Sequence, residues 1–260
     1  MENGTIMRSP RVRDAYLALC LASTFASGSV ARAQRPSNTW RWSITPYVWA
    51  AGTNGRVGAR DVVGSVDVTT GDVLQTGALA FMAALEGRRG RWLAHLDAFY
   101  VSTTDDEDLG PVLGKPSTLH IEQYQTMLAP HVGYSAFIWP KATVHAIAGL
   151  RYWHVKAELT AVLPSMSSGA ETSADWADGI VGADVRATPW GPRWHLLAYA
   201  DLGAGGSDFT WQALGGATYD LSRCCSIGLI YRHLDVDYES DRLVNDVAMG
   251  GPALSFGVRF

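Results

Sequence analysis

Hydrophobic and polar residues alternate with a period of two along most of the chain after Gln34, and this period predicts β-strands rather than helices. The segment 92–100 is the clearest example, because His95 and Asp97 lie on one face and the other face is apolar. The apolar face has an aromatic residue at each end, in the order Trp92, Ala94, Leu96, Ala98 and Tyr100. Aliphatic side chains between two aromatic ones fit a strand that faces lipid, with rings at both membrane–water interfaces.

The same alternation recurs in the segments 144–152, 177–186, 194–202 and 227–232. A soluble sandwich and a membrane barrel both produce it, so the period alone does not distinguish them. The end of the chain favours the barrel, because it alternates toward a terminal aromatic residue, with Leu254, Phe256, Val258 and Phe260 on the apolar face. Such an end resembles the signal that the barrel-assembly machinery recognises in outer-membrane barrels. That machinery is therefore an expected partner, through Phe260.

We expect ten strands, at residues 39–52, 74–88, 91–103, 118–134, 142–161, 175–187, 193–205, 208–220, 225–239 and 245–260. Tight turns at 88–91, 137–141, 188–193 and 221–225 alternate with longer loops at 55–72, 104–117 and 164–174. This layout is typical of bacterial outer-membrane barrels, and an even strand number places both termini on the periplasmic side.

The predicted fold class is all-β, a transmembrane antiparallel up-and-down β-barrel of about ten strands. A weak alternation at 58–68 leaves room for an extra hairpin and twelve strands, and eight strands is the smaller alternative. Several predicted strands exceed the roughly 9 to 11 residues that a crossing requires, so we expect them to project beyond the membrane.

Residues 1–33 have the features of a cleaved signal peptide, which leaves 34–260 as the barrel domain. Arg8, Arg11 and Arg13 precede a mostly apolar stretch at 16–26, and Ala31-Arg32-Ala33 gives a small-x-small cleavage pattern. No later run reaches the roughly 18 to 20 apolar residues of a membrane helix. We therefore expect export to the outer membrane of a Gram-negative cell envelope.

Composition supports a membrane location. Hydrophobic residues make up 47% of the chain and charged residues only 18%, below the roughly 25% of an average soluble protein. The chain has 10 Trp and 10 Tyr, the residues that settle at a membrane–water boundary. The net charge of -4 provides no basic surface for nucleic acid, so outer-membrane lipid and lipopolysaccharide are the expected surroundings.

Several motifs across nearly all of the mature chain resemble a family of uncharacterised proteobacterial outer-membrane β-barrel proteins, small barrels of the OmpA-like or porin-like kind. They are Trp40-Arg41-Trp42, Thr45-Pro46-Tyr47-Val48-Trp49, Gly90-Arg91-Trp92, Gly149-Leu150-Arg151-Tyr152-Trp153, Asp175-Trp176-Ala177-Asp178, Ser207-Asp208-Phe209-Thr210-Trp211-Gln212, Asp235-Val236-Asp237-Tyr238 and Gly250-Gly251-Pro252. The resemblance implies an outer-membrane barrel and no particular reaction. Cys224-Cys225 departs from the family's usual polar turn.

The polar faces of these strands predict a set of lumen-lining residues: His95, Asp97, His145, Arg151, Asp178, Asp184, Arg186, Asp201, Gln212, Arg232 and Arg259. One interpretation is a lumen that binds or passes a small polar solute. The other is a plug of salt bridges, because inward charges in a narrow barrel need opposite partners or water. Four Asp against four Arg favours the plug, and a ten-strand barrel is too narrow for a wide pore.

Three functions fit this pattern. The first is an envelope structural protein or a narrow channel for small polar solutes. The second is a barrel hydrolase acting on lipid or peptide, although no Gly-x-Ser-x-Gly motif occurs. The third is an adhesion or surface-binding protein that acts through its outer loops. The sequence predicts no catalytic residue, metal site or cofactor. The acidic run 105–108 is either a solvated loop or a holder of cations that bridge lipopolysaccharide phosphates.

Overall fold

The computed structural model describes residues 38–59, 62–71, 79–108, 118–163, 166–240 and 243–260. The predicted signal peptide and its boundary with the barrel domain lie outside these residues. Within them, no helix is both long enough and apolar enough to span a membrane.

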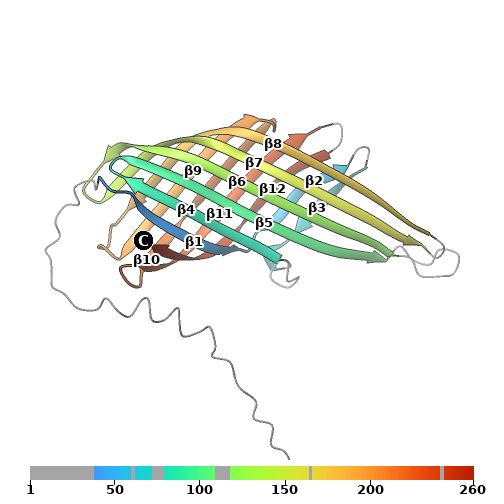
Figure 1. Cartoon of the computed structure of the whole chain (residues 1–260), viewed down its shortest axis with the longest axis horizontal. Coiled ribbons are helices and arrows are strands. Elements are labelled where there is room, and N and C mark those ends of the chain that lie inside the picture. The colour runs from blue at the N-terminus through green and yellow to red at the C-terminus, as the bar shows by residue number, and fades with distance from the viewer. Residues whose placement is uncertain (1–37, 60–61, 72–78, 109–117, 164–165, 241–242) are drawn as a thin grey trace, which may run out of the picture. The chain divides into compact units, whose positions relative to one another are not determined.

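The described residues form twelve strands. Their bounds are β1 Arg41–Trp49, β2 Gly52–Ala59, β3 Val62–Val68, β4 Leu79–Arg89, β5 Trp92–Asp108, β6 Thr118–Ile138, β7 Ala142–Leu163, β8 Met166–Ala187, β9 Trp194–Gly205, β10 Phe209–Asp220, β11 Cys225–Glu239 and β12 Leu243–Arg259. All strand pairs are antiparallel, from β1–β4 through each successive neighbour to β11–β12 (Figure 1).

Ten of these strands close into a barrel. β1 pairs with β4 on one side and with β12 on the other, so β1 and β4–β12 form a ring without a free edge along β1. The hairpin of β2 and β3 lies outside the ring, where β2 continues along β12 beyond the end of β1. These pairings confirm the predicted all-β antiparallel barrel of about ten strands.

The hairpin of β2 and β3 also decides between the ten-strand and twelve-strand alternatives. The predicted extra hairpin near 58–68 exists, but it adds two strands to the sheet without adding them to the ring. The corresponding prediction of a long loop at 55–72 is wrong, since β2 and β3 fill most of that range.

Two other predicted loops are wrong over the residues that the structure describes. β7 and β8 pair as far as Leu163 and Met166, so residues 166–174 belong to β8 although a loop was predicted at 164–174. The acidic run 105–108 is the end of β5 and pairs with β6. In both places the pairing with a long neighbouring strand outweighs weak local strand propensity. The four predicted tight turns lie where expected, between β4 and β5, β6 and β7, β8 and β9, and β10 and β11.

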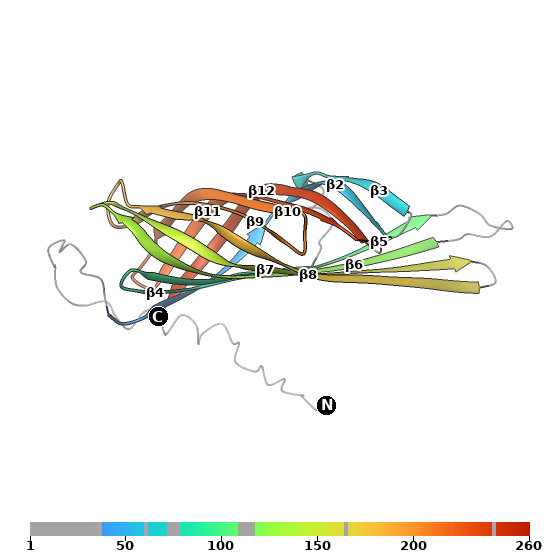
Figure 2. The same ribbon diagram turned by 90° about the horizontal axis from the view of Figure 1, so that it is seen from above.

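We call the end of the barrel where β1 begins and β12 ends the terminal end, and the opposite end the loop end. The strands β5, β6, β7 and β8 contain 17, 21, 22 and 22 residues, whereas β9 and β10 contain only 12 each. Figure 2 shows β5, β6, β7 and β8 extending beyond the other ring strands at the loop end. The crossing itself requires roughly 9 to 11 residues, so these strands are long enough to project by a similar length.

The half of the ring nearer the terminal end has an apolar outer wall about nine residues tall. Its aliphatic residues stand 54–65% exposed, and they are Val132, Leu150, Val181, Leu202, Leu229 and Leu254. Aromatic side chains border this wall on both sides, with Trp92, Tyr134 and Trp194 toward the terminal end and Tyr100, Tyr152 and Tyr231 toward the loop end. An apolar band between two aromatic girdles is the lipid-facing surface of a membrane barrel. We call it the lipid belt.

Beyond the lipid belt the polarity of the strands inverts. The outer face of β7 continues from Tyr152 to His154 and Lys156, which contact Asp175 and Glu171 of β8 at 2.8 Å and 3.1 Å. The inner face carries Trp153 and Val155, each only 1% exposed. Polar residues outside and apolar residues inside are typical of a β-structure surrounded by water. The chain therefore combines a membrane barrel with a water-exposed β-structure built on the same strands.

Candidate functional site

The barrel interior is the candidate site, because most of the predicted functional residues lie there. It is filled by three layers, which we call the mouth layer, the middle layer and the apolar layer, in order from the terminal end to the loop end.

The mouth layer is a charged cluster that crosses the interior. Arg186 on β8 donates to Glu86 on β4 at 2.6 Å and to Asp184 on its own strand at 2.9 Å. Arg88 also donates to Glu86, at 2.7 Å. Because β4 and β8 are not neighbours in the ring, the Arg186–Glu86 pair spans the barrel. The side chains of Arg186 and Arg88 are 25% and 36% exposed, so water reaches this layer from the terminal end.

Three histidines adjoin the mouth layer on neighbouring strands. The rings of His95 and His131 stack with centroids 4.6 Å apart, and His131 also contacts the ring of Tyr199 at 5.5 Å. His145 lies with Nδ1 3.4 Å from Asp184. The imidazoles are therefore packed against other rings and a paired carboxylate, which fixes them as part of the filling.

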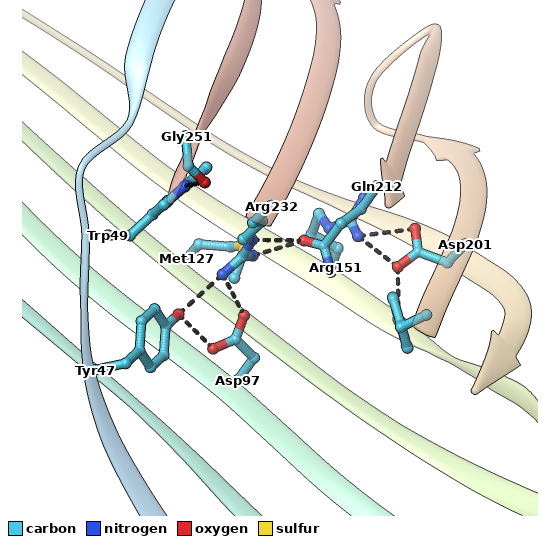
Figure 3. A network of polar contacts seen from close by, with 10 residues as sticks. Tyr47, Trp49, Asp97, Met127, Arg151, Asp201, Gln212, Arg232 and Gly251 are labelled. Carbon is cyan, nitrogen blue, oxygen red and sulfur yellow. Dashed lines mark hydrogen bonds and ion pairs between the residues drawn. The ribbon is translucent and has the colours of Figure 1, made fainter. Parts of the chain in front are cut away.

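Arg232 organises one half of the middle layer (Figure 3). Its Nη1 lies 2.8 Å from Asp97 and donates to the Tyr47 hydroxyl at 2.9 Å, while Tyr47 donates to Asp97 at 2.7 Å. Its Nη2 donates to the Gln212 side-chain oxygen at 2.6 Å. The guanidinium also lies over the Trp49 ring, 4.8 Å from the centroid. This group ties together β1, β5, β10 and β11.

Arg151 organises the other half. Its Nη2 donates to both carboxylate oxygens of Asp201 at 2.8 Å, and its Nη1 donates to the Thr210 hydroxyl at 2.8 Å. Tyr199 donates to Asp201 at 2.5 Å. The side chains of Arg151 and Asp201 are fully buried. A buried pair of this kind depends on hydrogen bonds to its remaining polar atoms. Tyr199 and Thr210 provide part of them, whereas Arg151 Nε is buried without a hydrogen-bond partner among the described residues.

The apolar layer closes the interior toward the loop end. It joins residues from both sides of the barrel, namely Trp49, Phe99, Met127, Trp153, Val155, Trp176, Leu234, Val236, Val247 and Met249. Met127, Leu234 and Val236 are 0% exposed. At this level the described side chains leave the interior filled, since the deepest of them have no exposed surface.

The predicted lumen-lining residues fall into these layers in a definite order. Ten of them line the interior: Asp184, Arg186, His95 and His145 near the mouth, and Asp97, Arg151, Asp178, Asp201, Gln212 and Arg232 deeper inside. Asp178 accepts a hydrogen bond from the backbone N–H of Ser207 at 2.8 Å, which holds the β9–β10 turn. Arg259 differs, because it lies at the rim, 39% exposed and paired with Asp220.

The sequence interpretation missed two kinds of interior residue. Tyr47, Glu86, His131 and Thr210 complete the polar contacts, and the signal for Tyr47 was its position opposite Ile44 and Val48 in the alternation. The apolar layer was missed altogether. Its signal was the loss of alternation at residues 98–101 and 152–155, where apolar side chains occupy both faces.

The polar side chains of the interior are hydrogen-bonded mainly to one another and to the backbone. The buried hydroxyls of Ser135 and Thr210 donate to backbone carbonyls of Arg91 and Asp235, at 3.2 Å and 2.8 Å, rather than to a histidine. Among the residues that the structure describes, no three of His, Cys, Asp and Glu are grouped so as to hold a metal ion. The interior arginines donate to carboxylates, an amide and hydroxyls, mostly on strands that are not their neighbours in the ring.

No protein-family model and no curated protein sequence matches this chain. Solved structures do resemble it. The outer membrane protease OmpT from Escherichia coli has a TM-score of 0.51 and 8% identity, covering 85% of this chain and 96% of that one. The translocator domain of the autotransporter NalP from Neisseria meningitidis has a TM-score of 0.47 and 13% identity, covering 85% and 89%. The attachment invasion locus protein Ail of Yersinia pestis, in complex with the heparin analogue sucrose octasulfate, has a TM-score of 0.35 and 16% identity, covering 85% of this chain and 99% of that one. The likeness to OmpT shows the fold, which is that of an outer-membrane β-barrel.

Proposed function

We propose that this protein is an integral outer-membrane barrel whose interior is closed to solutes and whose role is structural, holding a water-exposed β-structure at the cell surface. Among the roles that the sequence leaves open, this one fits the interior best. The observation that carries the proposal is the fully buried Arg151–Asp201 pair next to side chains without exposed surface in the apolar layer.

The energetics of the middle layer support a permanent closure. A solute passing this level would have to separate buried ion pairs, and leaving one buried charge without its partner costs roughly 3 to 5 kcal/mol. Displacing the packed aromatic rings would add to that cost. A filling of this kind lowers the free energy of the closed barrel and raises that of any open one.

Solute uptake into proteoliposomes tests the closure. Vesicles that contain the folded wild-type protein should swell no faster in small neutral sugars than protein-free vesicles. Uptake that depends on the protein and on the size of the sugar would show an open bore and contradict the proposal.

The orientation is the second part of the proposal. We infer that the terminal end lies in the periplasm and the loop end outside the cell, because β1 begins, β12 ends and the four tight turns lie at the terminal end. The exported chain then meets the assembly machinery through Phe260, which is 73% exposed at the terminal end. Outer-membrane phospholipid and lipopolysaccharide surround the lipid belt.

Labelling of intact cells tests this orientation. A membrane-impermeant maleimide should modify Glu158→Cys, which lies beyond the lipid belt on β7, and should leave Arg193→Cys unmodified until the outer membrane is permeabilised. The wild-type protein is the control for labelling of the native cysteines, because Cys224 lies in the β10–β11 turn and Cys225 begins β11, both at the terminal end. The reverse pattern would overturn the orientation.

Surface binding is a second candidate function, and one observation favours it. The outer face of β7 and β8 beyond the lipid belt offers Lys156, Glu158 and Glu171 in an ordered ion-pair array on strands of 22 residues. A rigid polar sheet that projects from the membrane is suited to binding another macromolecule. The test is the binding of intact cells to a surface before and after replacement of these three residues. A loss of binding while the barrel still folds would support this role over a purely structural one.

A further inference from the structure

The lipid belt is hollowed on one side of the barrel. A depression of about 430 Å³ lies over β4–β7, and its lining includes Leu85, Ala94, Leu96, Val132, Ala148 and Leu150. A second depression of about 240 Å³ shares Val132 and Ala148 with it and continues to Trp92 and Tyr134. The small residues Ala94 and Ala148 lie in register on either side of Val132, so the wall is low between Leu96 and Leu150. The hollow is almost wholly apolar.

Trp42 forms one side of the hollow. Its indole lies across Gly87 of β4, so closely that a Cβ at that position would come within 2.6 Å of the ring. The ring of Trp40 stacks on Trp42 with centroids 5.5 Å apart. Glycine at position 87 therefore allows the indole to lie flat on the barrel wall, next to Leu85, and to border the hollow.

Two arginines lie at the terminal-end border of the hollow. Arg89 is paired in register with Trp92, and the Arg91 guanidinium lies over the Tyr134 ring, 5.5 Å from the centroid. Among the described residues neither arginine has a carboxylate partner. Arg89 donates to the side-chain oxygen of Asn38 at 3.2 Å, and Arg91 donates to the Tyr134 hydroxyl at 3.4 Å. Both are exposed beside the aromatic girdle, where lipid headgroups lie.

We propose that this hollow is a binding site for an anionic phospholipid, with one acyl chain in the apolar depression and the phosphate against Arg89 and Arg91. The apolar lining matches a hydrocarbon chain, and guanidinium groups bind phosphate oxygens in a bidentate manner. The aromatic rings of Trp42, Trp92 and Tyr134 lie between the two parts, at the depth of the glycerol region. The site rests on the proposed placement of the lipid belt in the outer membrane, and it faces the periplasmic leaflet.

Native mass spectrometry of the detergent-folded protein tests the site, with phosphatidylglycerol and phosphatidylcholine as probes. Each arginine near an anionic headgroup contributes roughly a fivefold gain in affinity. We therefore expect Arg89→Gln/Arg91→Gln to lose about 25-fold in phosphatidylglycerol affinity, and clearly less in phosphatidylcholine affinity, because the choline cation offsets the charge of the phosphate. The matched control is Arg193→Gln/Arg223→Gln, which removes two exposed arginines from other turns at the same end and should keep wild-type affinity.

A second variant tests the hollow itself. Ala148→Phe fills the depression and should weaken the binding of both lipids, whereas Ala198→Phe, on the lipid face of β9 away from the hollow, should not. Equal effects of the two arginine pairs, or equal effects of the two phenylalanines, would overturn the site. So would a dimer of the chain in place of bound lipid.

The two proposals fail in different ways. A barrel that lets sugars into vesicles and still shows the lipid preference would contradict the closed interior and leave the lipid site standing. A closed barrel without that preference would do the opposite. Far-UV circular dichroism of each variant checks that the β-structure has formed before its lipid affinity is compared.

Discussion

The rings of Trp176 and Tyr238 stack face to face with centroids 4.0 Å apart, although they belong to β8 and β11, which do not pair. The short strands β9 and β10 separate β8 from β11 in the ring, but their hairpin ends below this level. The ring contact therefore joins the two sides of the water-exposed β-structure directly. It does so through side chains, where backbone hydrogen bonds no longer reach.

This contact predicts a large loss of stability in Trp176→Ala. The indole is 5% exposed and packs against Trp153 as well as Tyr238, so its removal should cost roughly 3 to 5 kcal/mol in the free energy of unfolding. Urea unfolding in detergent micelles measures it. Trp190→Ala is the control, because Trp190 is 69% exposed in the β8–β9 turn and should change the free energy by less than about 1 kcal/mol. Equal losses would mean that the loop-end core carries little of the stability.

The Arg232–Asp97 pair predicts strong coupling between two substitutions. Arg232→Met leaves the Asp97 carboxylate buried without its cation and should destabilise the barrel by roughly 3 to 5 kcal/mol. Asp97→Asn should cost a similar amount, and the double variant should cost clearly less than the sum, because it removes both charges. Urea unfolding of all four proteins gives the coupling energy. Additive losses would contradict the paired middle layer.

Arg259→Met provides the matched comparison for that cycle. Arg259 also pairs with an aspartate, Asp220, but at the rim, where its side chain is 39% exposed. Surface pairs of this kind contribute roughly 0 to 1 kcal/mol. The loss at Arg259 should therefore be several times smaller than the loss at Arg232.

The lipid belt predicts a position-dependent cost for an added charge. Leu150→Arg places a guanidinium in the middle of the belt and should make folding into vesicles less favourable by roughly 2 to 4 kcal/mol. Glu158→Arg lies on the same face of the same strand beyond the belt and should cost less than about 1 kcal/mol. Folding into phospholipid vesicles, followed by tryptophan fluorescence, compares the two. A similar cost at both positions would remove the boundary that Tyr152 marks.

The lipid-facing half of the barrel could be predicted from the sequence because its physics is local. A strand that faces lipid on one side and a polar interior on the other must alternate, so Trp92, Leu96 and Tyr100 could be assigned to the outer wall from their spacing alone. The tight turns followed from the same strand ends.

The loop-end half could not be predicted in this way. Trp153 and Val155 share the inward face of β7 with His145 and Arg151, yet they are apolar, because the surroundings change from lipid to water at Tyr152. The alternation of a membrane strand contains no mark of that change. The inversion becomes clear only when the two sides of the barrel that enclose the apolar layer are seen together.

Which inward side chains contact each other also could not be predicted from the sequence. Arg186 pairs with Glu86, a residue 100 positions away, and Arg232 with Tyr47, 185 positions away. Which inward residues meet across a barrel depends on strand tilt and stagger, which only the complete ring fixes. The inward charged residues could therefore be predicted from the sequence, whereas their pairs depend on the geometry of the closed ring.

Planar-bilayer recording tests the closed interior most directly. After insertion of the folded wild-type protein, we expect no discrete conductance steps over the full range of voltages that the bilayer withstands. Steady single-channel openings that change in size or ion preference when Arg151 or Arg232 is substituted would show that ions pass these residues, and would contradict a sealed barrel.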